Sequence, residues 1–162
     1  MSTEKITTDE IYAIIEEVSR ALGKPLRRKK GSTGEIMIKD SATYRHKKPT
    51  SLQNDEAAVY MFLTRDAFLK IGKANKKSNA RYTSHHYGFN APSTLAKSLC
   101  VNKIVKLESD AREWILNNTR RINILINCTD KDSKWATGLI EAIMHYKYRP
   151  RYEGKHPTTI GN

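Results

Sequence analysis

The apolar positions of this chain follow a helical period near the N-terminus. Residues 8–22 carry a stripe at helical spacing, formed by Ile11, Ile14, Ile15, Val18 and Leu22. Thr7 and Glu10 fit a capping box, and Gly23 and Pro25 end the pattern. The sequence therefore predicts a helix whose apolar stripe packs on the rest of the chain, with a second copy of the chain as the alternative partner.

Strand-like patterns follow in the middle of the chain. Residues 57–64 and 67–74 are apolar runs separated by two polar residues, which predicts a β-hairpin. Residues 122–126 alternate and are β-branched, which is typical of a strand. Residues 35–39 predict a short strand or half of a hairpin within a basic arm outside the core.

Four further helices are predicted, over residues 78–87, 93–99, 109–118 (with Ser109 as its cap) and 134–147. The order of elements indicates an α+β fold, a small three-stranded antiparallel sheet flanked by helices. We divide the chain into an N-terminal helix and basic arm over residues 1–50 and a main domain over residues 51–162.

Charge narrows the class of partner. The 162 residues hold 29 Lys and Arg against 17 Asp and Glu, a formal net charge of +12. Residues 24–48 hold nine cations and two acids, and residues 67–107 hold eight cations and no acid. A basic run alone is usually a solvated surface, but this excess favours a polyanionic partner.

Membrane and metal-binding features are not evident. No stretch is apolar enough to span a bilayer, and residues 1–5 lack the apolar core of a signal peptide. Cys100 and Cys128 each lie in or beside an apolar run, which predicts buried free thiols in a reducing, cytoplasmic setting. No Cys/His spacing fits zinc.

Five side chains form the candidate chemistry. Tyr60 and Lys70 lie on the two hairpin strands, and for both to project from one face the strands need an even register, with a loop of three or five residues rather than two. Arg81 and His85 lie one helical turn apart. Glu141 lies at the edge of the apolar stripe of the last helix.

These residues resemble a known signature. Ala58-Val59-Tyr60, then Lys70-Ile71-Gly72 with ten residues from Tyr60 to Lys70, resemble the paired motif of the GIY-YIG nucleases. Arg81 matches the helix arginine of that family. Glu141 resembles its metal-binding glutamate, and Pro150 stands where the family often has a proline.

The resemblance covers about residues 57 to 152, with departures. Ala58 replaces the first glycine, and Lys70 replaces the second tyrosine, as in a restriction-enzyme branch of the family. His85 occupies the place of that branch's histidine or tyrosine. Tyr152 stands where an asparagine is often found.

The resemblance implies hydrolysis with one metal ion. Glu141 would hold one Mg²⁺ (or Mn²⁺) per active site, and Arg81 would bind the scissile phosphate. Tyr60 would act as the general base, with the cations of Lys70 and Arg81 lowering its pKa. His85 would accept or relay the proton. The products would be 5′-phosphate and 3′-hydroxyl ends.

The predicted function is a restriction endonuclease acting on double-stranded DNA as a homodimer in the cytoplasm of a bacterial or phage-infected cell. The alternatives are a phage or repair nuclease that nicks DNA and a non-catalytic basic nucleic-acid-binding protein. The residues expected to contact DNA are Arg27, Arg28, Lys29, Lys30, Lys73, Lys76, Lys77, Tyr82, His86 and Asn90.

Overall fold

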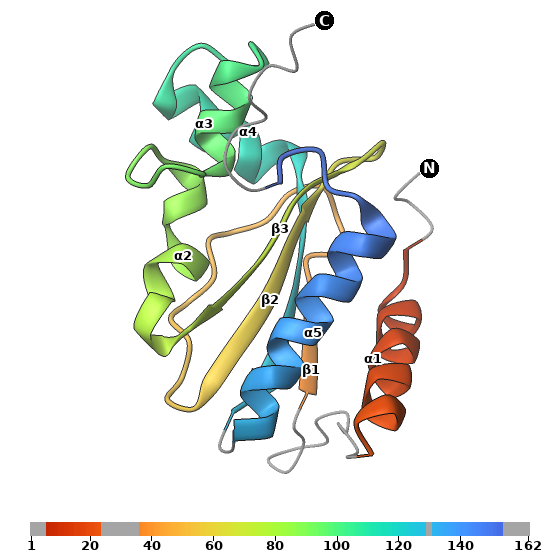
Figure 1. Ribbon diagram of the computed structural model, residues 1–162. Coiled ribbons are helices and arrows are strands. Elements are labelled where there is room, and N and C mark those ends of the chain that lie inside the picture. Colours follow the sequence, from red (N-terminus) through yellow and green to blue (C-terminus); the bar gives the residue numbers. More distant parts are fainter. Residues whose placement is uncertain (1–5, 24–35, 129–130, 154–162) are drawn as a thin grey trace, which may run out of the picture.

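The computed structural model describes residues 6–23, 36–128 and 131–153, and its centre is a four-stranded antiparallel sheet (Figure 1). The strands are β1 (Ile36–Asp40), β2 (Glu56–Leu63), β3 (Phe68–Asn75) and β4 (Arg120–Asn127). Their order in the sheet is β1-β4-β2-β3, so β4 and β2 are central and β3 forms one edge. The predicted α+β class is confirmed.

Helices cover both faces of the sheet. They are α1 (Thr8–Leu22), α2 (Asn79–Thr83), α3 (Leu95–Val101), α4 (Glu108–Asn118) and α5 (Lys131–Tyr148), with short 3-10 turns η2 (Lys76–Ser78) and η3 (His85–Tyr87). One apolar core lies between the sheet and α1 with α5, and a second lies between the sheet and α2, η3, α3 and α4 (Figure 1). Among the described residues, no helix is both long and apolar enough to cross a bilayer.

The first helix matches its prediction. Thr7 caps it, because the Thr7 hydroxyl accepts the backbone N–H of Glu10 at 3.1 Å. Gly23 ends it in the left-handed region at φ 65°. Three residues of its stripe, Ile11, Ile15 and Val18, are buried in the core that α5 shares. The predicted packing within the same chain is confirmed.

The prediction of three strands was wrong, because β1 joins the sheet as a fourth. It pairs with β4 from Ile36 opposite Ile126 to Asp40 opposite Ile122. Ile36 is buried rather than part of an arm outside the core. A central strand such as β4 needs backbone partners on both sides, and β1 supplies the second set.

The shared face of the candidate hairpin residues is confirmed. In the pairing of β2 with β3, Tyr60 lies opposite Gly72 and Phe62 lies opposite Lys70. Because directly paired residues project to the same side of a sheet, Tyr60 and Lys70 share a face. This is the face that α2, α3 and α4 cover.

The predicted loop length of that hairpin was wrong. The Thr64 N–H donates to the Ala67 carbonyl at 2.9 Å, which closes a tight turn with two central residues. Such a turn alone would put Lys70 on the other face. Leu63 pairs with Phe68, however, and Leu69 is an extra, unpaired residue in β3. This β-bulge restores the even register.

The chain after α5 returns to the edge strand. The Arg151 N–H donates to the Phe68 carbonyl and the Tyr152 N–H to the Leu69 carbonyl, each at 2.9 Å. These bonds cover the turn end of the β3 edge. They also place Glu153 beside the sheet rather than in a free tail.

Other predictions need correction. Residues 78–87 are not one helix, because α2 ends at Thr83 and a 3-10 turn follows Ser84. The fourth helix begins at Glu108 rather than being capped by Ser109. The sequence also favours a core position for Trp135, a large apolar side chain, but the residue is 79% exposed. Both cysteines are free thiols, with Cys128 buried and Cys100 partly exposed.

Candidate active site

The Tyr60 side chain lies in a slot on the sheet. Its cross-strand neighbours are Gly72 on β3 and Asn123 on β4, and the residue is 1% exposed. A β-carbon added to Gly72 would lie 2.7 Å from Cζ of Tyr60 and nearer still to Oη. The phenol therefore crosses over Gly72 and reaches the edge strand, and only glycine leaves room for it.

His86 fixes the phenol oxygen. Its Nε2 lies 2.7 Å from Tyr60 Oη, and its Nδ1 accepts the Leu95 N–H at 3.2 Å. Burial, and then the charges of Lys70, Arg121, Arg81 and His85, hold the pKa of His86 well below its usual range.

The imidazole of His86 is therefore neutral near pH 7. Because Nδ1 is an acceptor, the ring proton is on Nε2. His86 thus donates to the Tyr60 oxygen.

Opposing charges act on Tyr60. Burial raises its pKa above the ordinary value of 10.0, and the charges of Arg81 and Arg121 oppose that rise. The charge of Glu141 raises the pKa further. Burial dominates, so the side chain is a phenol at neutral pH. Arg81 and Glu141, which are 60 positions apart in the sequence, both affect the pKa of this hydroxyl.

A buried arginine lies under the site. Arg121 is 2% exposed and donates to Asn123 Oδ1 at 2.9 Å and to the Tyr82 carbonyl and Tyr87 hydroxyl at 2.6 Å each. Its guanidinium lies 4.7 Å from the Phe62 ring centroid. No carboxylate pairs with it in the part of the chain that the structure describes. Arg121 therefore supplies a permanent positive charge beside Tyr60.

Lys70 is also buried on this face, at 7% exposure. Burial lowers its pKa, and the charge of Arg81 lowers it further, while Glu153 raises it. The ammonium of Lys70 is therefore easier to deprotonate than an exposed lysine.

Glu141 reaches the edge of the sheet from α5. Its Oε2 lies 3.0 Å from Lys73 Nζ, and its Oε1 lies 3.9 Å from His145 Nε2. His145 Nδ1 contacts Glu153 Oε1 at 2.6 Å. Within the described ranges no three His, Cys, Asp or Glu side chains gather as a metal site. A cation here would have one protein carboxylate.

The two halves of the site meet at the β3 edge. Gly72 faces α2, whereas its neighbour Lys73 faces α5 and pairs with Glu141. Figure 1 shows α2 and α5 on either side of this edge. Tyr60 thus approaches the edge over Gly72, and Glu141 approaches it from the opposite face.

Arg81 lies between two basic cavities. It is exposed on α2 and lines a cavity of 390 Å³ together with Lys73, Lys76, Lys77 and Lys134. It also lines a cavity of 270 Å³ that includes His85. Tyr60, Lys70 and Glu141 line neither cavity. Arg81 and the predicted lysines therefore share one surface, which suits phosphate groups.

Several residues predicted to contact DNA do not lie on that surface. Tyr82 and His86 are 3% and 4% exposed, because they project into the core beside Tyr60, and only an edge of His86 reaches the wall of the 270 Å³ cavity. Asn90 is exposed but lines neither cavity. The predicted basic arm, Arg27, Arg28, Lys29 and Lys30, lies outside the described residues.

Sequence reasoning missed a polar network behind the site. His46 Nε2 lies 2.8 Å from the Tyr87 hydroxyl, and its Nδ1 lies 2.9 Å from the Thr119 carbonyl. Burial lowers the pKa of His46 to about 4, aided by the charge of Arg121. The alternation of β4, which puts Arg121 on the face of Tyr60, was the available signal.

No protein-family model matches this chain, and neither the curated proteins nor the solved structures contain a match to it. Membership of the GIY-YIG family is therefore a proposal. It is supported by the identities of Tyr60, Lys70, Arg81 and Glu141 and by their positions around the edge strand.

Proposed function

We propose that this protein is a metal-dependent endonuclease of the GIY-YIG type that hydrolyses phosphodiester bonds of double-stranded DNA. The observation that carries the proposal is the position of the Tyr60 oxygen, which lies across Gly72 where the charges of Arg81 and Glu141 both act on it. Cutting at a specific site by a homodimer, in a restriction-modification setting, is the form of activity that we favour.

The exposed cations bind the substrate in this proposal. Arg81 grips the scissile phosphate through its planar guanidinium. Lys73, Lys76 and Lys77, which line the same cavity, contact neighbouring phosphates and fix the position of the backbone.

Tyr60 takes the proton of the attacking water. His86 positions the phenol oxygen and stabilises it as a phenolate, because Nε2–H remains a donor in both states. This hydrogen bond favours His86 over His85 as the histidine next to the base, in the role of a donor. Because Tyr60 is a phenol, it can take a proton from water only as it gives up its own, and Lys70 in its neutral form, which the lowered pKa favours, would be the acceptor.

Glu141 would hold the metal. Its carboxylate is partly buried, at 21% side-chain exposure, and already pairs with one cation, the ammonium of Lys73. A single carboxylate suits Mg²⁺ or Mn²⁺, which keep several of their waters. When bound, the ion supplies charge stabilisation for the leaving 3′ oxygen.

Plasmid cleavage tests this proposal. Supercoiled DNA is incubated with the protein, with and without Mg²⁺, and products are resolved on a gel. Tyr60→Phe and Glu141→Gln are expected to lower the rate by at least about a hundredfold. The matched controls are Tyr82→Phe, which changes another buried phenol of the same core, and Glu113→Gln, which changes an exposed carboxylate of α4.

The products separate the competing functions. Discrete metal-dependent fragments support a restriction enzyme, whereas nicked circles or a smear support a phage or repair nuclease. A gel shift without any cleavage supports a non-catalytic binder, for which the basic surface around Arg81 is sufficient. Glu141→Gln should retain DNA binding, and its loss would argue against a role confined to the metal.

A further inference from the structure

The largest cavity described here lies away from the candidate active site. It measures 670 Å³ and adjoins the β2–β3 turn, whereas the 390 Å³ cavity of Arg81 lies at the opposite end of that hairpin. The large cavity is formed by the turn, the segment after β1, the end of α4 and the chain after α5. Its volume lies within the range of about 300–1,000 Å³ that is usual for small-molecule sites.

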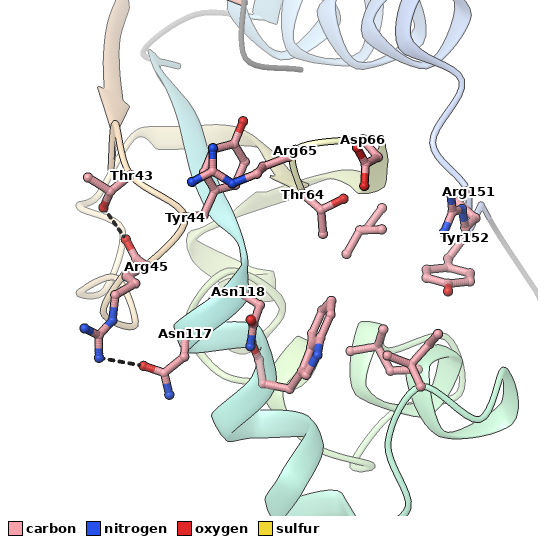
Figure 2. A pocket seen from close by; sticks show the side chains of 14 residues that line it. Thr43, Tyr44, Arg45, Thr64, Arg65, Asp66, Asn117, Asn118, Arg151 and Tyr152 are labelled. Carbon is pink, nitrogen blue, oxygen red and sulfur yellow. Dashed lines mark hydrogen bonds between the residues drawn. The ribbon is translucent and has the colours of Figure 1, made fainter. Parts of the chain in front are cut away.

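The cavity combines an aromatic wall with cations. Trp114 is partly buried in its wall, next to the apolar side chains of Leu99 and Ile104. Figure 2 shows Arg45 on one side of the cavity and Arg151 on the other. Arg65 and Asp66 of the turn also line it, so three arginines face one carboxylate and the net charge is positive. Within the described residues neither Arg45 nor Arg151 has an ion-pair partner. Such a site suits a planar ring that carries an anionic group.

The asparagines at the end of α4 add an acceptor. The Asn117 amide donates to the Glu113 carbonyl, and its oxygen accepts from Arg45 at 3.1 Å. The Asn118 amide donates to the Trp114 carbonyl at 3.0 Å, which fixes its nitrogen toward the helix. The remaining oxygen of Asn118 can accept an N–H from a ligand, as the exocyclic amine of a nucleobase offers.

We propose that this cavity binds a nucleotide, with the base against Trp114 and the phosphate attracted by the positive charges of Arg45 and Arg151 on its two sides. The nucleotide is either free in solution or an unpaired unit of a DNA strand, because a base stacked inside a duplex presents no accessible face. This inference concerns binding at a second site and does not rest on the proposed nuclease activity.

Fluorescence of Trp114 tests the proposal. The chain has two tryptophans, so Trp135→Phe leaves Trp114 as the only reporter, and Trp135 is too exposed for its loss to disturb the fold. The full-length variant is titrated, without metal, with dAMP, with deoxyribose 5-phosphate, with a short single-stranded oligodeoxyadenylate and with a blunt duplex of equal length.

Saturable quenching by dAMP supports the proposal for a free nucleotide, and quenching by the single strand alone supports it for an unpaired unit. Arg45→Ala and Arg151→Ala should each lower the affinity for the ligand that quenches by about tenfold. Lys47→Ala, which removes an exposed cation outside the cavity, should leave that affinity unchanged.

Three results overturn the proposal. They are no quenching by any ligand, equal affinity for the base-free sugar phosphate, and equal or tighter binding of the duplex. Failure of plasmid cleavage would leave this assay unaffected, so the two proposals can fail separately.

Discussion

The two faces of the sheet bury different kinds of side chain. The face toward α1 and α5 buries mostly apolar side chains, with Val59, Met61, Ile71, Ile122, Ile124 and Ile126 on its strands, and its buried arginine, Arg120, is paired with Asp40. The face toward α2, α3 and α4 also buries polar groups, namely Lys70, His86, Arg121 and Asn123. Both faces belong to the same four strands, so the contrast comes from alternate positions along them.

This difference separates the face that mainly stabilises the fold from the face that carries the candidate chemistry. An apolar face gains free energy from burial alone, whereas buried charged groups cost free energy unless each hydrogen bond is satisfied. In the described structure every buried side-chain nitrogen and oxygen has a partner. The polar face is thus an ordered network, and four substitutions measure how far its behaviour differs from that of the apolar face.

The largest effect is expected from Arg121→Met. The change removes the donor to the Tyr82 carbonyl, the Tyr87 hydroxyl and Asn123, which remain buried. Unsatisfied buried acceptors should lower the free energy of unfolding by roughly 3 kcal/mol, measured by urea denaturation. Arg112→Met, at an exposed position of α4, is the matched control. Equal stability of the two variants would mean that the network adds little to the free energy of unfolding.

Gly72→Ala should have the next largest effect, a loss of about 2 kcal/mol, because its β-carbon would overlap the Tyr60 ring. Tyr60→Leu removes that ring and should make the second substitution nearly harmless. A double-mutant cycle in urea measures this coupling. Additive losses would show that the phenol does not occupy the slot over Gly72.

Acid should destabilise the polar face. The pKa of His46 is about 4 in the fold, below the ordinary 6.5, so the unfolded chain takes up the proton first as the pH falls. His46 therefore contributes stability near pH 7 that is lost between about 6.5 and 4, and His86 acts in the same direction. In urea titrations across this window, the stability of His46→Gln should decline less steeply than that of the wild-type protein.

The smallest effect belongs to the other face. Thr7→Ala removes the cap of α1 and should cost about 1 kcal/mol. Thermal denaturation at about pH 7 and at about pH 5 compares it with Thr8→Ala in the first turn, which removes no cap. A loss of stability that is the same at both pH values would contrast with the pH-dependent contribution of His46. A loss that changes with pH would argue against the distinction between the two faces.

Strongly periodic segments of the fold could be predicted from the sequence. The stripe of α1, the β2–β3 hairpin, the strand at residues 122–126 and the long α5 all have clear periods. The short β1 was predicted as a strand, but its place in the sheet could not be predicted, because that place depends on the open side of β4 rather than on the five residues of β1. The bulge at Leu69 was equally hidden, since two-residue turns and bulges leave no distinct pattern here.

The candidate site was predictable only in part. Strand alternation placed Tyr60 and Lys70 on one face, but the choice between His85 and His86 assumed an unbroken helix, which Ser84 interrupts. Arg121 was missed because counting charges treats every arginine as a surface residue. Burial is a property of tertiary packing, and that packing turns a strand arginine into part of the site.

The unpaired Leu69 bears on how far the spacing between the two hairpin motifs can vary. Without it, Leu63 would still face Phe68 and Phe62 would still face Lys70, so a chain with nine residues from tyrosine to lysine would keep both side chains on the same side. A deletion at another position between 60 and 70 would put the tyrosine and the lysine on opposite faces of the sheet. Distant relatives should therefore be sought with either nine or ten residues in this interval.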